Sequence, residues 1–193
     1  MTNARYVRQY WNLLGEHASS LGTSGHAFCK MYWLSEGTIE PISSLDFNAK
    51  KAMDSIMSKY NILEMEVPRG NKTHMIGYTI DLVMQHKLTG AITLADFKFS
   101  SKFTNEQYKE SKNKNAGLLN FPFDGFRDVA YDKGSIQLEM YKRLFEEDNK
   151  IKVDEKVLIH IDGLSREPFY GEKGYKPYIA KECSEQVELI LSA

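Results

Sequence analysis

The stretch that most constrains the fold runs from Met75 to Ser100, MIGYTIDLVMQHKLTGAITLADFKFS. It holds two runs with strand-like alternation, because side chains along a strand repeat every two residues. Lys87-Leu88-Thr89-Gly90 offers a short reversal between them, in which Gly90 can take a positive φ at no steric cost. We therefore predict a β-hairpin at the centre of the chain. Its even-numbered residues include Ile76, Ile80, Leu82 and Met84 in the first run, and Ile92, Leu94, Asp96 and Lys98 in the second.

Three charged residues are expected at one end of this hairpin. With the turn centred on Leu88-Thr89, Asp81 lies opposite Asp96. A shift of one residue would place Asp81 opposite Lys98 instead. Two carboxylates on adjacent strands repel each other and are costly to desolvate unless a cation is near. Mg²⁺ or Mn²⁺ would offset that cost through oxygen ligands, and the alternative is an ordinary Asp–Lys ion pair across the strands.

Four short motifs follow one another along the chain. Gly22-Thr23-Ser24-Gly25-His26 comes first, Gly77 then precedes Asp81, and Asp96-Phe97-Lys98 comes after the turn. Gln137-Leu138-Glu139-Met140-Tyr141 completes the series. Together they resemble the RecB-like exonuclease branch of the PD-(D/E)XK nuclease superfamily, whose pattern is a helical histidine motif, G-x-x-D, D-x-K and Q-x-x-x-Y. This chain has one extra residue between its Gly77 and Asp81.

The resemblance implies a role for each matching residue. Asp81 and Asp96 would bind Mg²⁺ or Mn²⁺, with His26 and the Phe97 carbonyl as further ligands. Lys98 would orient a metal-bound water for attack on phosphorus. Asp81, Asp96 and Lys98 are therefore the expected catalytic residues.

Two further sets of acidic and imidazole side chains remain open from the residues alone. Thr23 or Ser24 could cap a helix whose first turn contains His26, and a partly buried structural histidine is the alternative to a ligand. Glu64 and Glu66 share a face by strand parity. The resemblance implies that one of them could supplement the metal site, and exposed glutamates on an edge strand are the alternative.

Contacts to DNA are expected from two segments. The resemblance implies that Gln137 and Tyr141, four apart on one face of a helix, hold the DNA backbone. Periodicity disappears between Ser100 and Val129, where lysines alternate with aromatic residues. Spaced lysines attract phosphates and aromatic rings stack on unpaired bases, whereas the alternative is a solvated loop. The candidate DNA contacts in this loop are Lys102, Lys109 and Lys112.

The remaining periodicity predicts the other elements. Helices are expected over about 4–16, 25–35, 46–60, 135–147 and 183–191, and strands over 62–67, 156–161 and 175–180. Asp46 is the expected cap of the third helix, and Pro68 the expected end of the first strand. This order favours an α/β fold with a central mixed β-sheet flanked by helices. The resemblance implies a restriction-endonuclease-like core and a single nuclease domain over residues 1–193.

Charge, cysteine content and apolar runs bear on the partners and the cellular location of the protein. The net charge is −1 over 193 residues, so the chain has no overall charge that favours nucleic acid, although a local basic strip would leave the total unchanged. Cys29 and Cys183 cannot form a zinc or iron–sulfur site by themselves, and two buried thiols in a reducing compartment are expected. No apolar run reaches membrane-spanning length and no signal-peptide core follows Met1. We therefore expect an intracellular protein, in the cytoplasm of a bacterium or of a phage host, without a membrane partner.

The resemblance thus implies a metal-dependent DNA nuclease, and more narrowly an exonuclease in recombination, repair or phage DNA processing. Its expected partner is single- or double-stranded DNA with free ends, and a protein partner from a recombination or replication complex is a further expectation. Two alternatives stay open. One is a structure- or sequence-specific endonuclease, and the other is a catalytically silent nucleic-acid-binding module on the same fold.

Overall fold

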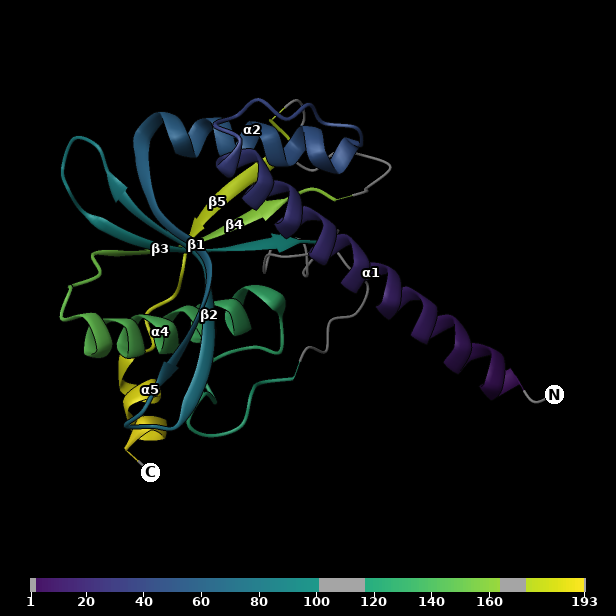
Figure 1. The fold of residues 1–193 in the computed structure, drawn as a ribbon. Helices are drawn as coiled ribbons and strands as arrows, with labels where there is room; N and C mark the ends of the chain where they lie inside the picture. The colour runs from purple at the N-terminus through teal and green to yellow at the C-terminus, as the bar shows by residue number, and fades with distance from the viewer. Residues whose placement is uncertain (1–2, 101–116, 164–172, 193) are drawn as a thin grey trace.

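A mixed β-sheet forms the centre of the molecule (Figure 1). The structure, a computed structural model, describes residues 3–100, 117–163 and 173–192, with side chains from residue 19 onward. Within this part the sheet has five strands in the order of the chain, of which β3 and β4 are parallel and the other neighbouring pairs antiparallel. The strands are β1 (Tyr60–Asn71), β2 (Ile76–His86), β3 (Ile92–Phe99), β4 (Glu155–Ile161) and β5 (Tyr175–Ile179).

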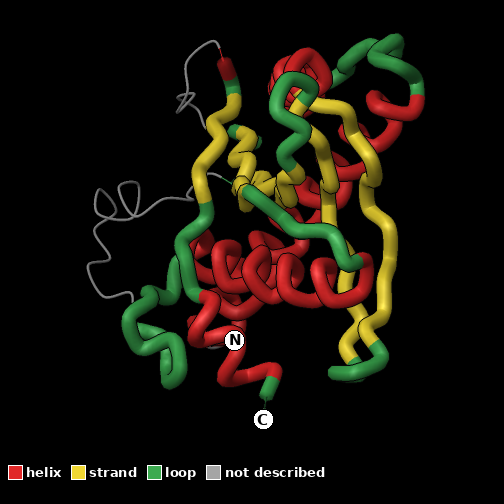
Figure 2. Tube along the Cα trace, turned by 90° about the vertical axis from the view of Figure 1, so that its left-hand side faces the viewer, coloured by secondary structure: helices red, strands yellow, loops and turns green. Residues whose placement is uncertain are grey.

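Helices cover both faces of this sheet. α1 (Asn3–Leu34) and α2 (Ser44–Lys59) pack on one face, and α4 (Ala130–Asn149) packs on the other. α5 (Ser184–Leu191) lies against α4, near the C-terminus of the chain (Figure 2). The expected α/β fold, with a mixed sheet flanked by helices, is confirmed. None of the helices in the described part of the chain is both long and apolar enough to cross a membrane.

Two apolar clusters hold these layers together. Ala95 and Phe97 of β3 join the cluster under α1 and α2, and Leu94 joins the cluster under α4. Alternation along β3 therefore leaves Asp96 and Lys98 on the α4 side. Cys29 and Cys183 are buried and free, so the expectation of two buried thiols is confirmed.

One continuous helix replaces the two helices predicted near the N-terminus. α1 runs unbroken from Asn3 to Leu34 and extends beyond the sheet (Figure 1). The predicted cap at Thr23 is wrong: its hydroxyl donates to the Ser19 carbonyl at 3.0 Å, inside the helix. The reason lies in tertiary packing, since a Cβ built on Gly25 would lie 2.4 Å from the Phe99 ring. Gly25 allows α1 to approach β3 closely and does not end the helix.

Other boundaries differ for local reasons. Ser43, not Asp46, caps α2, and Asp46 completes a capping box by accepting from the Ser43 amide at 3.0 Å. β1 continues through Pro68, because β1 is an edge strand and proline can occupy such a position. The hairpin turn is as predicted, with Gly90 at a φ of +74°.

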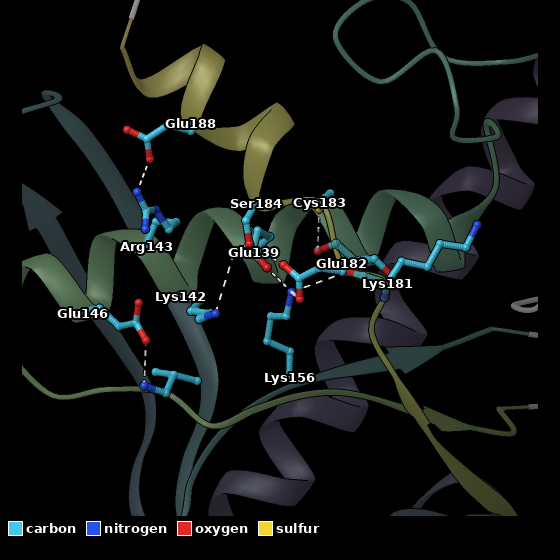
Figure 3. Close-up of polar contacts among 12 residues, drawn as sticks. Glu139, Lys142, Arg143, Glu146, Lys156, Lys181, Glu182, Cys183, Ser184 and Glu188 are labelled. Carbon is cyan, nitrogen blue, oxygen red and sulfur yellow. Dashed lines mark hydrogen bonds and ion pairs between the residues drawn. The ribbon is translucent and has the colours of Figure 1, made fainter.

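Ion pairs and a hydrogen bond link the start of α5 and the residues before it to α4 and β4 (Figure 3). Lys156 of β4 is buried and contacts the buried Glu139 of α4, and it lies 3.3 Å from Glu182. Ser184, the first residue of α5, donates to Glu139 at 2.9 Å. Buried charges require such pairing, because removing one partner leaves the other uncompensated. This cluster explains why Glu139 lies within the 137–141 motif without facing the site described next.

Candidate metal centre

The hairpin register brings the two predicted aspartates opposite each other. Leu82 pairs with Ala95 and Gln85 with Ile92, so that Asp81 and Asp96 form the next position of the ladder. The Phe97 amide donates to Asp81 Oδ2 at 2.8 Å. Of the two registers considered from the sequence, the one centred on Leu88-Thr89 is therefore correct.

Asp81 of this pair lies close to two residues from other elements. His26 of α1, Glu66 of β1 and Asp81 of β2 each offer one ligand atom, and these atoms lie within 4.8 Å of one another. His26 Nδ1 is 2.6 Å from Glu66 Oε1 and 3.7 Å from Asp81 Oδ2. The imidazole also lies edge-on to the rings of Phe97 and Phe99, which limits its orientations. Because α1 runs unbroken from Asn3 to Leu34, His26 lies in the interior of this helix and not in the first turn of a helix as predicted.

Glu66 reaches this site through an unusual backbone conformation. Its φ is +54°, although its neighbours Met65 and Val67 pair regularly with β2. A left-handed residue inside a strand costs on the order of 1–3 kcal/mol and persists only when its surroundings impose it. The predicted shared face of Glu64 and Glu66 is wrong, because Glu64 pairs with Arg69 while Glu66 turns to His26.

β2 rotates at the same level. Ile80 belongs to the apolar cluster under α4, whereas Leu82 belongs to the cluster under α1 and α2. Both are even-numbered, so strict alternation would have placed them on one face. The change of face occurs at Asp81, across the ladder from Glu66. This rotation turns the Asp81 carboxylate toward His26 of α1.

A row of polar side chains lies on the α4 side of the aspartate pair. Lys98 Nζ is 2.6 Å from Asp96 Oδ2 and donates to Gln137 Oε1 at 3.2 Å. Gln137 in turn donates to Tyr141 Oη at 2.9 Å, which confirms that these two side chains share one face of α4. The row therefore connects the buried Asp96 to the surface of α4 through Lys98.

Burial and mutual repulsion dominate the electrostatics of the aspartates. Burial, followed by the charge of Asp96, raises the pKa of Asp81 to about 7, although His26 and the Phe97 amide act in the opposite direction. Burial also raises the pKa of Asp96, against the effect of Lys98. The protein by itself therefore supplies too little positive charge to hold both carboxylates ionised at neutral pH.

The donor set fits a divalent cation. Within the described part of the chain, Asp96 Oδ2 is buried and accepts no hydrogen bond of regular geometry, although the Lys98 ammonium is near. Carboxylate oxygens with one imidazole nitrogen suit Mg²⁺ or Mn²⁺, and the imidazole favours Mn²⁺. His26, Glu66 and Asp81 would hold the ion, with Asp96 next to Asp81. The Phe97 carbonyl as a ligand stays a prediction, since Phe97 enters the site through its amide.

The structure thus brings together most of the predicted site residues. His26, Asp81, Asp96 and Lys98 meet at one end of the hairpin, and Gln137 and Tyr141 adjoin them. The loop candidates Lys102, Lys109 and Lys112 lie outside the described residues. Sequence reasoning left Glu66 undecided against Glu64, because nothing in the local sequence signals the left-handed backbone that separates them.

No family model matches the chain, and no curated protein matches it. What the site can do must therefore be argued from its own residues.

Proposed function

We propose that the protein is a metal-dependent DNA nuclease of the PD-(D/E)XK type, with a restriction-endonuclease-like core. One observation carries the proposal: the buried Asp96 and the partly buried Asp81 face each other across a hairpin, with a histidine and a glutamate on one side and a lysine on the other. The parallel β3–α4–β4 connection supports the same core, because it places α4 over the strand that carries Asp96 and Lys98. An isolated surface ion pair would not need three buried or half-buried acids at one point.

The expected ion is Mg²⁺ or Mn²⁺. When bound, such an ion lowers the pKa of a water molecule and neutralises charge on a phosphodiester. His26, Glu66 and Asp81 are positioned to hold it, and Asp96 lies within reach of Asp81. The raised pKa of Asp81 implies that ion binding and loss of a carboxyl proton are linked.

Lys98 supplies the second element of the chemistry. Its ammonium has only donors, so it orients a water or a phosphate oxygen and does not join the metal ligands. Attack by water forms the new P–O bond while the bond to the 3′ oxygen breaks, the water loses a proton to solvent and the 3′ oxygen takes one up. The positive charge of Lys98 stabilises the charge that develops. Gln137 fixes the ammonium from α4, and Tyr141 extends this polar row toward the strand of DNA.

Asp96-Phe97-Lys98 favours an active enzyme over a silent binding module, because DNA binding alone does not require a lysine paired with a buried aspartate beside two more acids. Exonuclease action on free ends is the form that we propose, and closed circular DNA distinguishes it from an endonuclease.

The test is degradation of end-labelled linear single- and double-stranded DNA, and of closed circular DNA, with EDTA, Mg²⁺ or Mn²⁺. We expect metal-dependent loss of linear DNA and survival of the circle. The Asp81→Asn variant should be inactive. The matched control is Asp128→Asn, which removes an exposed acid paired with Lys133 and should cut at the parental rate. A parental protein that leaves every substrate intact under all these conditions contradicts the proposal.

A further inference from the structure

α4 crosses the stem of Lys98 at a glycine. Gly134 is buried in the second turn of α4, one turn before Gln137. A Cβ built on Gly134 would lie 3.3 Å from Lys98 Cε and 3.0 Å from Leu158 Cδ2. Both distances are shorter than ordinary contacts between carbon atoms, which are about 3.5–4.0 Å. The space above Lys98 therefore exists only because residue 134 has no side chain.

This glycine is unfavourable for the helix itself. Glycine is among the least favourable residues in a helix interior, because it gains conformational freedom on unfolding and adds no packing. α1 contains a contrasting case, since a Cβ on Gly22 would meet nothing within 4 Å. Alanine could thus replace Gly22 freely, whereas at position 134 it would press on two neighbours.

The two neighbours differ in their freedom to move. Leu158 is fully buried on β4, within the cluster under α4, so it cannot give way without disturbing the core. The Lys98 side chain is 26% exposed and is held mainly at its tip, by Asp96 and Gln137. A methyl group at position 134 would press on both side chains, and Lys98 is the one of the two that has room to move away.

We propose that Gly134 is a positioning residue, which sets the Lys98 ammonium against Asp96 by leaving room for its stem under α4. The inference rests on the proposed function for its catalytic consequence. α4 then acts on Lys98 at two points one turn apart: Gly134 admits the stem, and Gln137 binds the ammonium.

The test compares Gly134→Ala with the matched control Gly22→Ala, which makes the same chemical change in open space. Gly134→Ala should lower kcat roughly 10–100-fold, because a small misplacement of a catalytic group is costly. Its affinity for DNA in EDTA should change less than about threefold, since a shifted lysine still attracts phosphate. Gly22→Ala should have the same kcat and the same affinity for DNA as the parent. Cleavage by Gly134→Ala at the parental rate would overturn the inference.

A second readout does not depend on activity. In metal-free protein with ¹³C-labelled lysine, the Lys98 Cε signal is identified by its absence from the Lys98→Ala spectrum. It should shift in Gly134→Ala and stay in place in Gly22→Ala. An unshifted Lys98 signal in Gly134→Ala refutes the packing, whatever the protein does to DNA. If the parent fails to cut DNA but this signal moves, the proposed function fails while the packing inference stands.

The double variant Lys98→Ala/Gly134→Ala shows whether position 134 acts through Lys98. With the lysine stem removed, the alanine at 134 should cost no further activity relative to Lys98→Ala alone. Should Gly134→Ala alone fail to fold, the double variant should regain the folded circular dichroism spectrum. A double variant that is equally unfolded, or slower than Lys98→Ala, would place the obstruction at Leu158 and reject the inference.

Discussion

Asp81→Asn should make the metal-free protein more stable while it removes metal binding and cleavage. Asn keeps an oxygen that accepts from the Phe97 amide, so the 2.8 Å hydrogen bond survives. It removes a carboxylate whose burial and proximity to Asp96 raise its pKa from 3.8 to about 7. The substitution therefore relieves an electrostatic cost and keeps the local geometry.

The size of the effect follows from this pKa. Each pKa unit corresponds to about 1.4 kcal/mol, so the cost of ionising Asp81 is a few kcal/mol at most. The Asp81 side chain is 14% exposed, and its contact with solvent relieves part of the cost of ionisation. We expect about 2 kcal/mol of added stability above pH 7, or roughly 4–8 °C in Tm for a chain of this length.

The dependence on pH has a definite sign. Because the folded protein binds the Asp81 proton more tightly than the unfolded chain, this group destabilises the fold increasingly as pH rises from about 4 to 7. Metal-free parental protein should lose stability over that range, and Asp81→Asn should lose less. Added Mn²⁺ should raise the Tm of the parent and leave that of Asp81→Asn unchanged.

Thermal unfolding at pH 5 and pH 8, once in EDTA and once with Mn²⁺ in place of EDTA, measures the dependence of stability on pH and the shift in Tm on addition of metal. Asp128→Asn again serves as the control, since it removes an exposed acid and should follow the parent. An Asp81→Asn protein that is no more stable than the parent at pH 8 would refute the electrostatic reasoning. One that still responds to Mn²⁺ would refute the ligand assignment.

Three further predictions concern single features of the site. Lys98→Ala should lower kcat on the order of 10²–10⁴-fold with little change in DNA affinity. Lys98→Arg should not restore the rate, because the planar guanidinium does not fit the place of the compact ammonium. Steady-state kinetics measure kcat, and filter binding measures the affinity for DNA. Gly25→Ala should weaken Mn²⁺ binding about tenfold or more, because it forces α1 and His26 away from β3, and a Gly22→Ala control in the same titration should not. DNA binding should weaken steeply with salt through Lys102, Lys109 and Lys112, so a flat dependence between low and physiological salt would exclude that loop from phosphate contact.

The hairpin was predictable because its signals are local. The alternation of the two runs and the turn with Gly90 identify both strands and reduce the register to two choices. The structure has the one that places Asp81 opposite Asp96. Lys98 follows from Asp96 by parity, and the contact of Gln137 with Tyr141 follows from helical spacing. These parts of the site depend on residues close in sequence or on one short turn.

The mistaken parts depend on contacts between distant segments. Gly25 carries the local signature of a helix end, yet it serves the approach of α1 to Phe99, a residue far along the chain. Strand parity assigns Glu64 and Glu66 to one face, yet a left-handed backbone at Glu66 separates them. Propensity and periodicity describe an isolated element, so they cannot report what its neighbours impose.

The two local irregularities have one physical origin in the site. β2 changes face at Asp81, and β1 takes a left-handed conformation at Glu66, directly across the ladder. Regular alternation continued from Met65 and Leu82, which both face α1 and α2, would direct these carboxylates to the α4 side. Rotating both strands at one level places the two acids beside His26, at the expense of backbone strain and carboxylate repulsion. A bound cation would relieve the repulsion and leave only the strain. If the proposed ion binds at this ladder, the metal-free fold is the less stable form.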